Sequence, residues 1–573
     1  MKFIETGKDK KKVIRSIVEG LILIGILAVL LHALFVFKKY VPYDKEDPSI
    51  FGGDETGFLA LSYFAVDRDG TSTMISTDRL NEHMAALHKN GYVTITQEDI
   101  LNYYEKGIPL PQKALFLMFE DGRKDTAVFA QKILEKYNYK GTILSYADRF
   151  HTRDSKFLSP KDIKNLNGNT FWELGTNGYR LSYINVFDRK GNYLGEMDSS
   201  EYNSHREELY RNYNHYLMDF IRDENQIPRE TYEELEERIS KDYKLMDEIY
   251  TKDLGSLPDL YVLMHSNTGG FGNNRKASMV NEKWIKKLFK MNFNREGYSY
   301  NNRENSMIDL TRMQPQAYWY PNHLLMRIKD DIQGEIQFEE GDLARKEDWE
   351  VLEGVSEFRG PVIALTSEPE GNGLLRLKGS KYADFKLEVS LTGNKIGTQT
   401  IYLRADEDLK KYVSVKLQNN YLYIIENGKD LYTLDLATLD APVKEKEQKS
   451  AAKKKEDIPP IQVNEGGNRK IQIILKKDKI WVNVDGKKVA GEVPLSGGST
   501  GYIYLESAWG EYGYSQRNIA DDVYDGVFED ITIRDGDNDN IVLYDNQLHG
   551  SEKAKAEISG KFKRVVNWFI KAL

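Results

Sequence analysis

Cysteine is absent from the 573 residues, so the chain has no disulfide framework, no thiol nucleophile and no cysteine-ligated zinc site. Positive charge is not in excess either: the formal net charge is −9 and no basic domain stands out, so nothing indicates nucleic-acid binding. The length predicts two or three domains. Tyrosine is abundant, with 36 residues, which suits stacking on sugar rings and equally suits packing in β-domains.

One long apolar run lies near the N-terminus. Residues 20–37 are apolar except for His32, which is just long enough to cross a bilayer. Lysines and Arg15 precede the run and predict a cytoplasmic N-terminus. A cleaved signal peptide is the competing interpretation, but the run continues into Lys38 without a small-x-small cleavage site. We therefore expect a cytoplasmic tail, an uncleaved anchor and an extracytoplasmic linker, at residues 1–16, 17–37 and 38–57.

The most informative stretch is the apolar run 114–119 followed by Glu120, Asp121 and Gly122. A continuous apolar run predicts a strand buried on both faces, as in a parallel α/β sheet. Functional sites of such sheets lie at the carboxyl ends of the strands. Two carboxylates at that point can divide the chemistry, with one as base and one as metal ligand. The alternative is that Asp-Gly only makes a turn.

This stretch resembles the first motif of the polysaccharide deacetylase (NodB-like) family, which normally reads Phe-Asp-Asp-Gly. Residues 75–80 and 87–96 resemble the segment that precedes this motif in the biofilm-polysaccharide branch of the family. The resemblance implies a deformed (β/α) barrel over residues 58–333 and an esterase-type hydrolysis of acetyl groups with a zinc-type divalent metal. Glu120 then takes the place of the catalytic base and Asp121 that of a metal ligand.

Three positions depart from the family pattern: Asn177, Leu181 and Glu120. The segment Trp172 to Thr176 matches the second motif, but Asn177 and Leu181 replace its two metal-binding histidines. Asparagine binds divalent metals weakly and leucine does not bind them, which leaves Asp121 as the one family ligand. Glutamate at the base position moves the carboxylate by over ~1 Å, an error that can cost about a hundredfold in rate. A relocated metal site would join Asp121 to one of four histidines, but their spacing gives it no support: His151, His205, His215 and His265.

Other candidate site residues follow from the same resemblance. His265 ends an apolar strand and matches either the family's late Leu-x-His motif, whose histidine acts as acid, or the earlier Tyr-Pro-x-Gly motif. Arg312 lies in a short strand that closes the barrel, where it can pair with a site carboxylate. Trp172 and Asn177 are candidate substrate contacts.

After a linker at 334–361, residues 362–550 alternate in short segments typical of an all-β sandwich. Turns at Asn427-Gly428 and Asp485-Gly486 predict two hairpins. The region resembles concanavalin-like jelly rolls, a fold common among carbohydrate-binding modules. Candidate sugar contacts are Trp509, Tyr512 and Tyr514 in a glycine-rich loop, with Asp521 and Asp522 nearby. The alternative is a sandwich that only supports the barrel.

Residues 551–573 form a basic amphipathic helix by pattern. Its apolar face comprises Phe562, Val565, Val566, Phe569, Ile570 and Leu573. Such a helix lies in a membrane interface or docks onto the sandwich.

Two functions from different classes fit these observations. One is a divergent carbohydrate esterase with Glu120 as base, Asp121 on a metal or water and His265 as acid. The other, favoured by the missing histidine pair, is a membrane-anchored, non-catalytic protein that binds an exported polysaccharide. A third interpretation is a scaffold of a membrane polysaccharide synthase complex.

Overall fold

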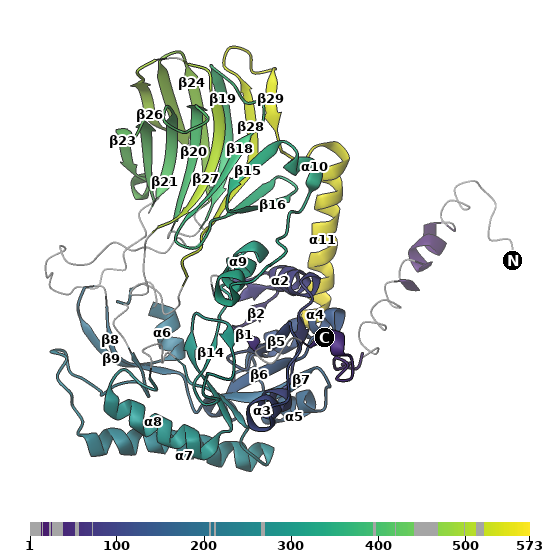
Figure 1. The fold of residues 1–573 in the computed structure, drawn as a ribbon, viewed down its shortest axis with the longest axis vertical. Helices are drawn as coiled ribbons and strands as arrows, with labels where there is room; N and C mark the ends of the chain where they lie inside the picture. The colour runs from purple at the N-terminus through teal and green to yellow at the C-terminus, as the bar shows by residue number, and fades with distance from the viewer. Residues whose placement is uncertain are drawn as a thin grey trace.

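The computed structural model describes residues 13, 15–21, 24–25, 38–51, 57–71, 73–188, 190–205, 208–210, 214–264, 270–393, 397–418, 420–439, 468–497, 499–510 and 521–572. Figure 1 shows an α/β body formed by the N-terminal half of the chain and a β-sandwich above it. None of the helices in these ranges is both long and apolar enough to cross a bilayer. Most of the predicted anchor at 17–37 lies outside the described residues.

A closed sheet of mainly parallel strands forms the α/β body. Its strands follow the order β13-β1-β5-β6-β7-β11-β12-β14, with β4 paired to β5. The sheet closes because Met313, directly after β14, pairs in parallel with Leu61 of β1, and its N–H donates to the Ala60 carbonyl at 2.9 Å. The predicted α/β barrel is confirmed in this form. The strands are β1 Phe58–Tyr63, β4 Val93–Thr94, β5 Ala114–Phe119, β6 Gly141–Tyr146, β7 Trp172–Gly178, β11 Leu260–Val262, β12 Met291–Glu296, β13 Tyr300–Asn301 and β14 Leu310–Arg312.

Strand β5 shows why a continuous apolar run suits this position. All six of its residues are buried, and they alternate between two clusters. Phe116 and Met118 belong to the cluster inside the barrel, where Phe116 stacks on Phe293 with ring centroids 5.6 Å apart. Leu117 and Phe119 belong to the cluster beneath the surrounding helices. Since side chains alternate along a strand, the inward series continues directly into Glu120.

Helices surround the barrel, and several begin at side-chain caps. Thr96 and Asp99 form a capping box at the start of α3, and Thr231 and Glu234 form another at the start of α7. The helical segments are η1 Pro48–Ile50, α2 Thr77–Lys89, α3 Gln97–Lys106, α4 Lys124–Tyr137, η2 Ala147–Arg149, α5 Pro160–Asn167, α6 Ser199–His205, α7 Tyr232–Leu254, α8 Arg275–Leu288, α9 Pro321–Ile332, α10 Leu343–Lys346, η3 Leu436–Leu439 and α11 Gly550–Ala572.

The chain between β7 and α7 forms a small antiparallel sheet. Its order is β10-β8-β9, with β8 Ser182–Phe187, β9 Tyr193–Asp198 and β10 Asn214–His215; β2 Val66–Asp67 and β3 Ile75–Ser76 pair separately. Leu181, Tyr183 and Val186 are buried in the same cluster as Tyr146 and the inward-facing residues of the barrel strands. These side chains therefore fill the carboxyl end of the barrel.

Two sheets form the C-terminal sandwich, in the orders β15-β18-β27-β20-β21-β22-β23 and β16-β17-β28-β19-β24-β25-β26, with β29 on β28. Both predicted hairpins are present: residues 427 and 428, and residues 485 and 486, have positive φ at the turns that join β22 to β23 and β25 to β26. The strands are β15 Trp349–Glu353, β16 Val355–Arg359, β17 Val362–Thr366, β18 Asn372–Leu377, β19 Phe385–Thr392, β20 Gly397–Ala405, β21 Val413–Gln418, β22 Tyr421–Glu426, β23 Lys429–Asp435, β24 Arg469–Lys476, β25 Lys479–Val484, β26 Lys487–Pro494, β27 Tyr502–Trp509, β28 Asp525–Asp535 and β29 Val542–Asp545.

The boundary of the sandwich differs from the prediction. Residues 334–361, expected as a linker, contain α10, β15 and β16, so the sandwich begins at Trp349 and not at Val362. The apolar alternation of these strands is hard to recognise in the sequence because three glutamates interrupt it: Glu350, Glu353 and Glu357. Trp349 is nevertheless buried in the core between the sheets.

The sandwich meets the barrel at α9. His323 of α9 is fully buried, with its Nε2 2.9 Å from Asp521 and its Nδ1 3.1 Å from Asp525, which opens β28. The indole of Trp319 stacks on the same imidazole, with ring centroids 4.3 Å apart. Burial alone lowers the pKa of His323, but the two aspartates outweigh it and raise the pKa to about 9. A charged histidine between two carboxylates therefore joins the domains.

This joint predicts a pH-dependent stability. Because the pKa of His323 rises on folding from about 6.5, its contribution is complete below that pH and is lost as the pH rises through about 9. His83 of α2 stays neutral over this range, since burial lowers its pKa to about 3. We expect the free energy of unfolding, measured in urea, to fall by on the order of 3 kcal/mol between pH 6.5 and 9.5.

The variant His323→Gln should be less stable at pH 6.5 and should lose most of this pH dependence. His549→Gln is the matched control, because His549 is exposed and pairs with Asp545 of β29 within the sandwich domain. If the free energy of unfolding of His323→Gln falls with pH as much as that of the wild type, the assignment of the pH dependence to His323 is wrong.

Candidate functional site

A strained turn follows β5. Asp121 and Gly122 both adopt left-handed backbone conformations, with φ of 67° and 57°. A Cβ on Gly122 would lie 2.7 Å from the Cβ of Ser145, so only glycine fits there. The left-handed conformation of a non-glycine residue costs about 1–2 kcal/mol, and such strain concentrates at functional sites. The turn places Asp121 directly after β5 and Glu120.

Glu120 is held on every side. Ser62 of β1 donates its hydroxyl to Oε1 at 2.6 Å, and Arg312 of β14 donates Nε–H to the same oxygen at 3.0 Å. Gln314 donates to Oε2 at 3.1 Å. The residue is only 1% exposed. Both carboxylate oxygens are thus occupied by protein donors.

Arg312 connects Glu120 to a second carboxylate. Its Nη2 donates to Glu296 of β12 at 2.9 Å, and the guanidinium is fully buried. Burial raises the pKa of the Glu120 carboxyl, Arg312 lowers it and Glu296 raises it again, with a net increase. The sequence-predicted pairing of Arg312 with a site carboxylate is therefore present in the structure.

The positions of the family's histidine pair do not fit a metal. The Asn177 Oδ1 accepts the backbone N–H of Asp121 at 3.3 Å, and its Nδ2 donates to the Met264 Sδ at 3.5 Å. Leu181 is buried among apolar side chains. In the part of the chain that the structure describes, no group of three histidine, aspartate or glutamate residues is placed to hold a metal ion. Asp121 with an amide and a leucine is not a zinc donor set.

The side chain of Asp121 is more exposed than that of Glu120. Its side chain is 14% exposed and its Oδ2 lies 3.8 Å from Nη1 of Arg123. Burial raises the pKa of Asp121 to about 7, against the opposing effects of Arg123 and Arg149. The carboxyl is therefore partly protonated at neutral pH, and it can accept or donate a hydrogen bond.

Polar residues after β6 extend this rim, and the sequence analysis did not single them out. Asp148 and Arg149 lie in η2, with 3.5 Å between the carboxylate Oδ1 and the guanidinium Nε. Arg180, after β7, lies 3.3 Å from Asp242 and stacks on the ring of Tyr216 at 4.0 Å. The signal that could have found Asp148 and Arg149 is the one used for Glu120, since both directly follow an apolar strand.

Several predicted site residues lie elsewhere. Trp172 begins β7, so it is at the amino end of the barrel, where its Nε1 donates to Gln131 at 2.6 Å. Trp509 donates its indole N–H to the Asp521 carbonyl at 3.2 Å, which places it beside the domain joint. The side chains of Asp521 and Asp522 pair with His323 and Arg327 of α9. His265 and Tyr512 are outside the described residues, as are Tyr514 and the segment 511–520.

The three described histidines of the relocated metal set, His151, His205 and His215, form no metal-binding group with Asp121. His151 pairs with Asp253 at 2.8 Å, and His205 lies 3.4 Å from Glu208. His215 contacts the Arg180 carbonyl at 3.4 Å.

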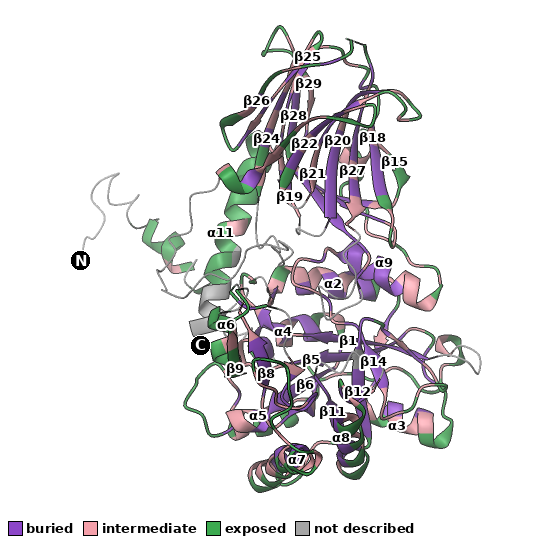
Figure 2. Cartoon of the chain, turned by 90° about the vertical axis from the view of Figure 1, so that its left-hand side faces the viewer, coloured by how far each residue is buried: buried purple, intermediate pink, exposed green. Residues whose placement is uncertain are grey.

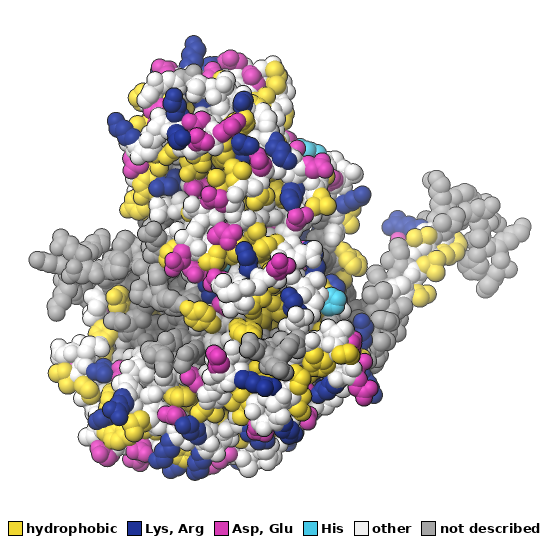
Figure 3. Space-filling model, viewed as in Figure 1, with side chains coloured by type: hydrophobic (Ala, Val, Ile, Leu, Met, Phe, Trp, Pro, Cys, Tyr) yellow, Lys and Arg dark blue, Asp and Glu magenta, His cyan; other side chains and the backbone are white. Residues whose placement is uncertain are grey.

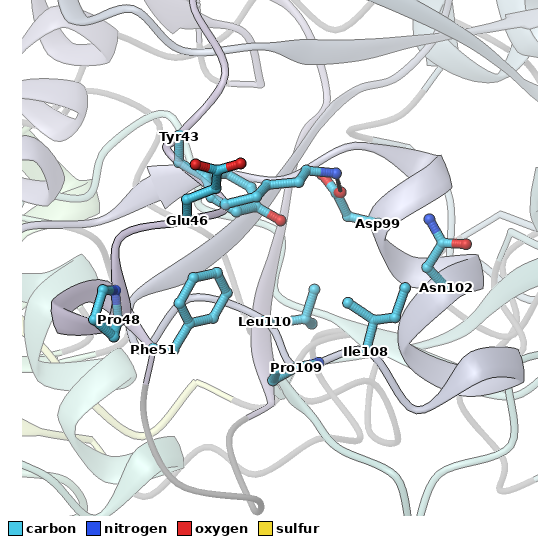
Figure 4. Close-up of a pocket in the computed structure, with 10 residues that line it drawn as sticks. Tyr43, Glu46, Pro48, Phe51, Asp99, Asn102, Ile108, Pro109 and Leu110 are labelled. Carbon is cyan, nitrogen blue, oxygen red and sulfur yellow. Dashed lines mark hydrogen bonds and ion pairs between the residues drawn. The ribbon is translucent and has the colours of Figure 1, made fainter.

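A cavity of about 530 Å³ lies at the opposite, amino end of the barrel (Figure 4). The segment 38–51 forms one wall, with Tyr43 and Phe51 in edge contact at 6.3 Å. Lys45 reaches Asp99 of α3 at 2.7 Å across it. This cavity is separate from the strand ends that carry Glu120.

The buried ion pairs predict a stability effect. Arg312→Met would leave Glu120 and Glu296 buried without their counter-ion, so we expect a loss of about 3–5 kcal/mol in the free energy of unfolding measured in urea. Arg312→Lys should recover part of it, because one ammonium replaces one of the two contacts. The exposed Arg153→Met serves as control and should change stability by less than ~0.5 kcal/mol. Equal losses of stability in Arg312→Met and Arg153→Met would refute the prediction that the ion pairs of Arg312 with Glu120 and Glu296 stabilise the fold.

Comparisons with known proteins agree with the motif resemblance. No family model matches the chain. A poly-β-1,6-N-acetyl-D-glucosamine N-deacetylase of Escherichia coli (strain K12) is 30% identical over 86 residues, which is 14% of this chain and 13% of the relative. The chain therefore aligns with only a small part of the curated relative.

Two solved structures are similar to the N-terminal half. The de-N-acetylase from Aggregatibacter actinomycetemcomitans is 16% identical, with a TM-score of 0.36 and coverage of 46% of this chain and 97% of that one. The deacetylase domain of BpsB from Bordetella bronchiseptica is 14% identical, with a TM-score of 0.35 and coverage of 47% and 97%. The resemblance to polysaccharide deacetylases of the biofilm type, predicted from the motifs, is confirmed by the match to the E. coli relative.

Proposed function

We propose that this chain binds an exported, N-acetylated polysaccharide at the carboxyl end of its deacetylase-like barrel without hydrolysing it by metal chemistry. The observation that carries the proposal is the state of Glu120. A general base must come within hydrogen-bond reach of the proton it removes. Glu120 is 1% exposed and both of its oxygens accept hydrogen bonds from protein side chains. It serves as the counter-ion of Arg312.

The outer rim supplies the binding chemistry. Asp121, Asp148 and Arg149 are half-buried at the ends of β5 and β6, where carboxylates and a guanidinium can bind hydroxyl and acetamide groups of a sugar. The positive charge of Arg149 lowers the pKa of Asp121, which supports a common rim for the two side chains. Half-buried Tyr179 lies beside them and offers an aromatic surface.

The proposal includes a location of the protein at the membrane, with its two domains outside the cytoplasm. The apolar run 20–37 with its preceding basic residues supports a single membrane anchor with the barrel and sandwich outside the cytoplasm. In that setting the protein would handle a polysaccharide as it is exported, as part of a membrane synthase complex. Mixed acidic and basic side chains on the face shown in Figure 3 fit a neutral glycan better than a nucleic acid.

The first test measures metal content, acetate release and glycan binding on one preparation of the full chain in mild detergent. The probe is partly deacetylated poly-β-1,6-N-acetyl-D-glucosamine. We expect binding, no acetate release and no stoichiometric zinc, cobalt or nickel. Bound metal together with acetate release that Asp121→Ala abolishes would overturn the proposal and establish an esterase with a rebuilt site.

A second test locates the bound glycan. Arg149→Ala should weaken binding of the same poly-β-1,6-N-acetyl-D-glucosamine probe about tenfold, because a charge-assisted hydrogen bond is lost. Arg303→Ala is the matched control, since Arg303 donates to the Gly107 carbonyl away from the rim. Titration calorimetry on both variants decides the matter, and unchanged affinity in Arg149→Ala would place the glycan elsewhere.

A further inference from the structure

Helix α11 is exposed along almost its whole described length (Figure 2). Among residues 551–566 whose side chains are described, all are exposed except the half-buried Gly560. Its first turn is attached where Arg345 of α10 reaches Glu552 at 3.3 Å. Farther along, the helix contacts α4. None of its described side chains belongs to the core of the sandwich.

An apolar stripe runs along this exposed helix. Ile558, Phe562, Val565 and Val566 are 68%, 66%, 52% and 37% exposed. Their spacing of four, seven and eight residues from the first puts them on one face. Most helical stability in proteins comes from packing an amphipathic face, and isolated helices are marginal in water. The stripe therefore lacks a covering surface among the described residues.

The charge of the helix indicates what that surface is. From residue 551 to the end, the sequence has six basic residues and two acidic ones: Lys553, Lys555, Lys561, Lys563, Arg564 and Lys571 against Glu552 and Glu557. Basic residues next to an apolar stripe match an anionic lipid surface, which attracts each cation near it. A protein groove would have to supply both an apolar floor and matching acidic groups.

The position of α11 supports the same surface. The backbone of Val41 exchanges hydrogen bonds with the side chain of Asn138, which ends α4, at 3.0 and 2.7 Å. α11 contacts the same helix. Figure 1 shows α11 running towards α4. The helix and the segment that follows the predicted anchor therefore both contact the region of α4.

We propose that α11 lies in the interface of an anionic bilayer, with Ile558, Phe562, Val565 and Val566 buried among the lipid chains and the basic residues at the headgroups. The helix is a second membrane contact, distinct from the predicted anchor. It sets how the barrel and the sandwich are held against the surface. This proposal does not depend on what the barrel binds.

The absence of cysteine makes a direct test available. A nitroxide label on Val565→Cys reports the apolar stripe, and a label on Glu557→Cys, on a different face of the same helix, is the matched control. The full chain is reconstituted in vesicles of phosphatidylcholine with phosphatidylglycerol, and in vesicles of phosphatidylcholine alone. Accessibility to a water-soluble nickel quencher and to oxygen gives the depth of each label.

In the anionic vesicles, we expect nickel accessibility at Val565→Cys to fall several-fold below that at Glu557→Cys, with oxygen accessibility raised. The difference should shrink without phosphatidylglycerol and after the added changes Lys561→Glu and Arg564→Glu. Equal exposure of the two labels in anionic vesicles would overturn the proposal. Shielding of Val565→Cys that is independent of lipid charge would also overturn it and would assign a protein segment as the cover. Unchanged glycan binding in these variants separates this result from that of the proposed function.

Discussion

One guanidinium carries the charge balance of the barrel. Arg312 comes from the closing strand and reaches Glu120 beside β5 and Glu296 on β12, so ion pairs without access to water join three parts of the wall. Removing one partner of such a buried set leaves an uncompensated charge, at a cost of several kcal/mol. The position of the Glu120 carboxylate and its contact with the closing strand both depend on this side chain.

The site consequently has two levels. The inner level is apolar and ionic, with Leu181 and Tyr183 above the barrel strands and Glu120 below them. The outer level is polar and partly open, with Asp121, Asp148 and Arg149 at the strand ends. Asn177 and Leu181, at the positions that match the family's histidines, do not form a metal donor set between the two levels.

Sequence reasoning succeeded where the signal is local. The Asn427-Gly428 and Asp485-Gly486 turns need positive φ, and the apolar run before Glu120 needs a strand buried on both faces, so residue type alone indicates the structure. It failed where a residue's role depends on a distant partner. The sequence analysis did not predict that Asp521 pairs with His323, nearly two hundred residues earlier in the chain. No local pattern reports that contact.

The direction of α11 has a geometric consequence. The helix runs roughly along the longest dimension of the molecule, from the sandwich towards α4 (Figure 1). If α11 lies flat in a lipid interface, the long axis of the molecule would be roughly parallel to the membrane surface and not perpendicular to it. Barrel and sandwich would then sit at similar heights above the lipid, and a polymer that emerges nearby would pass both domains side by side instead of one after the other.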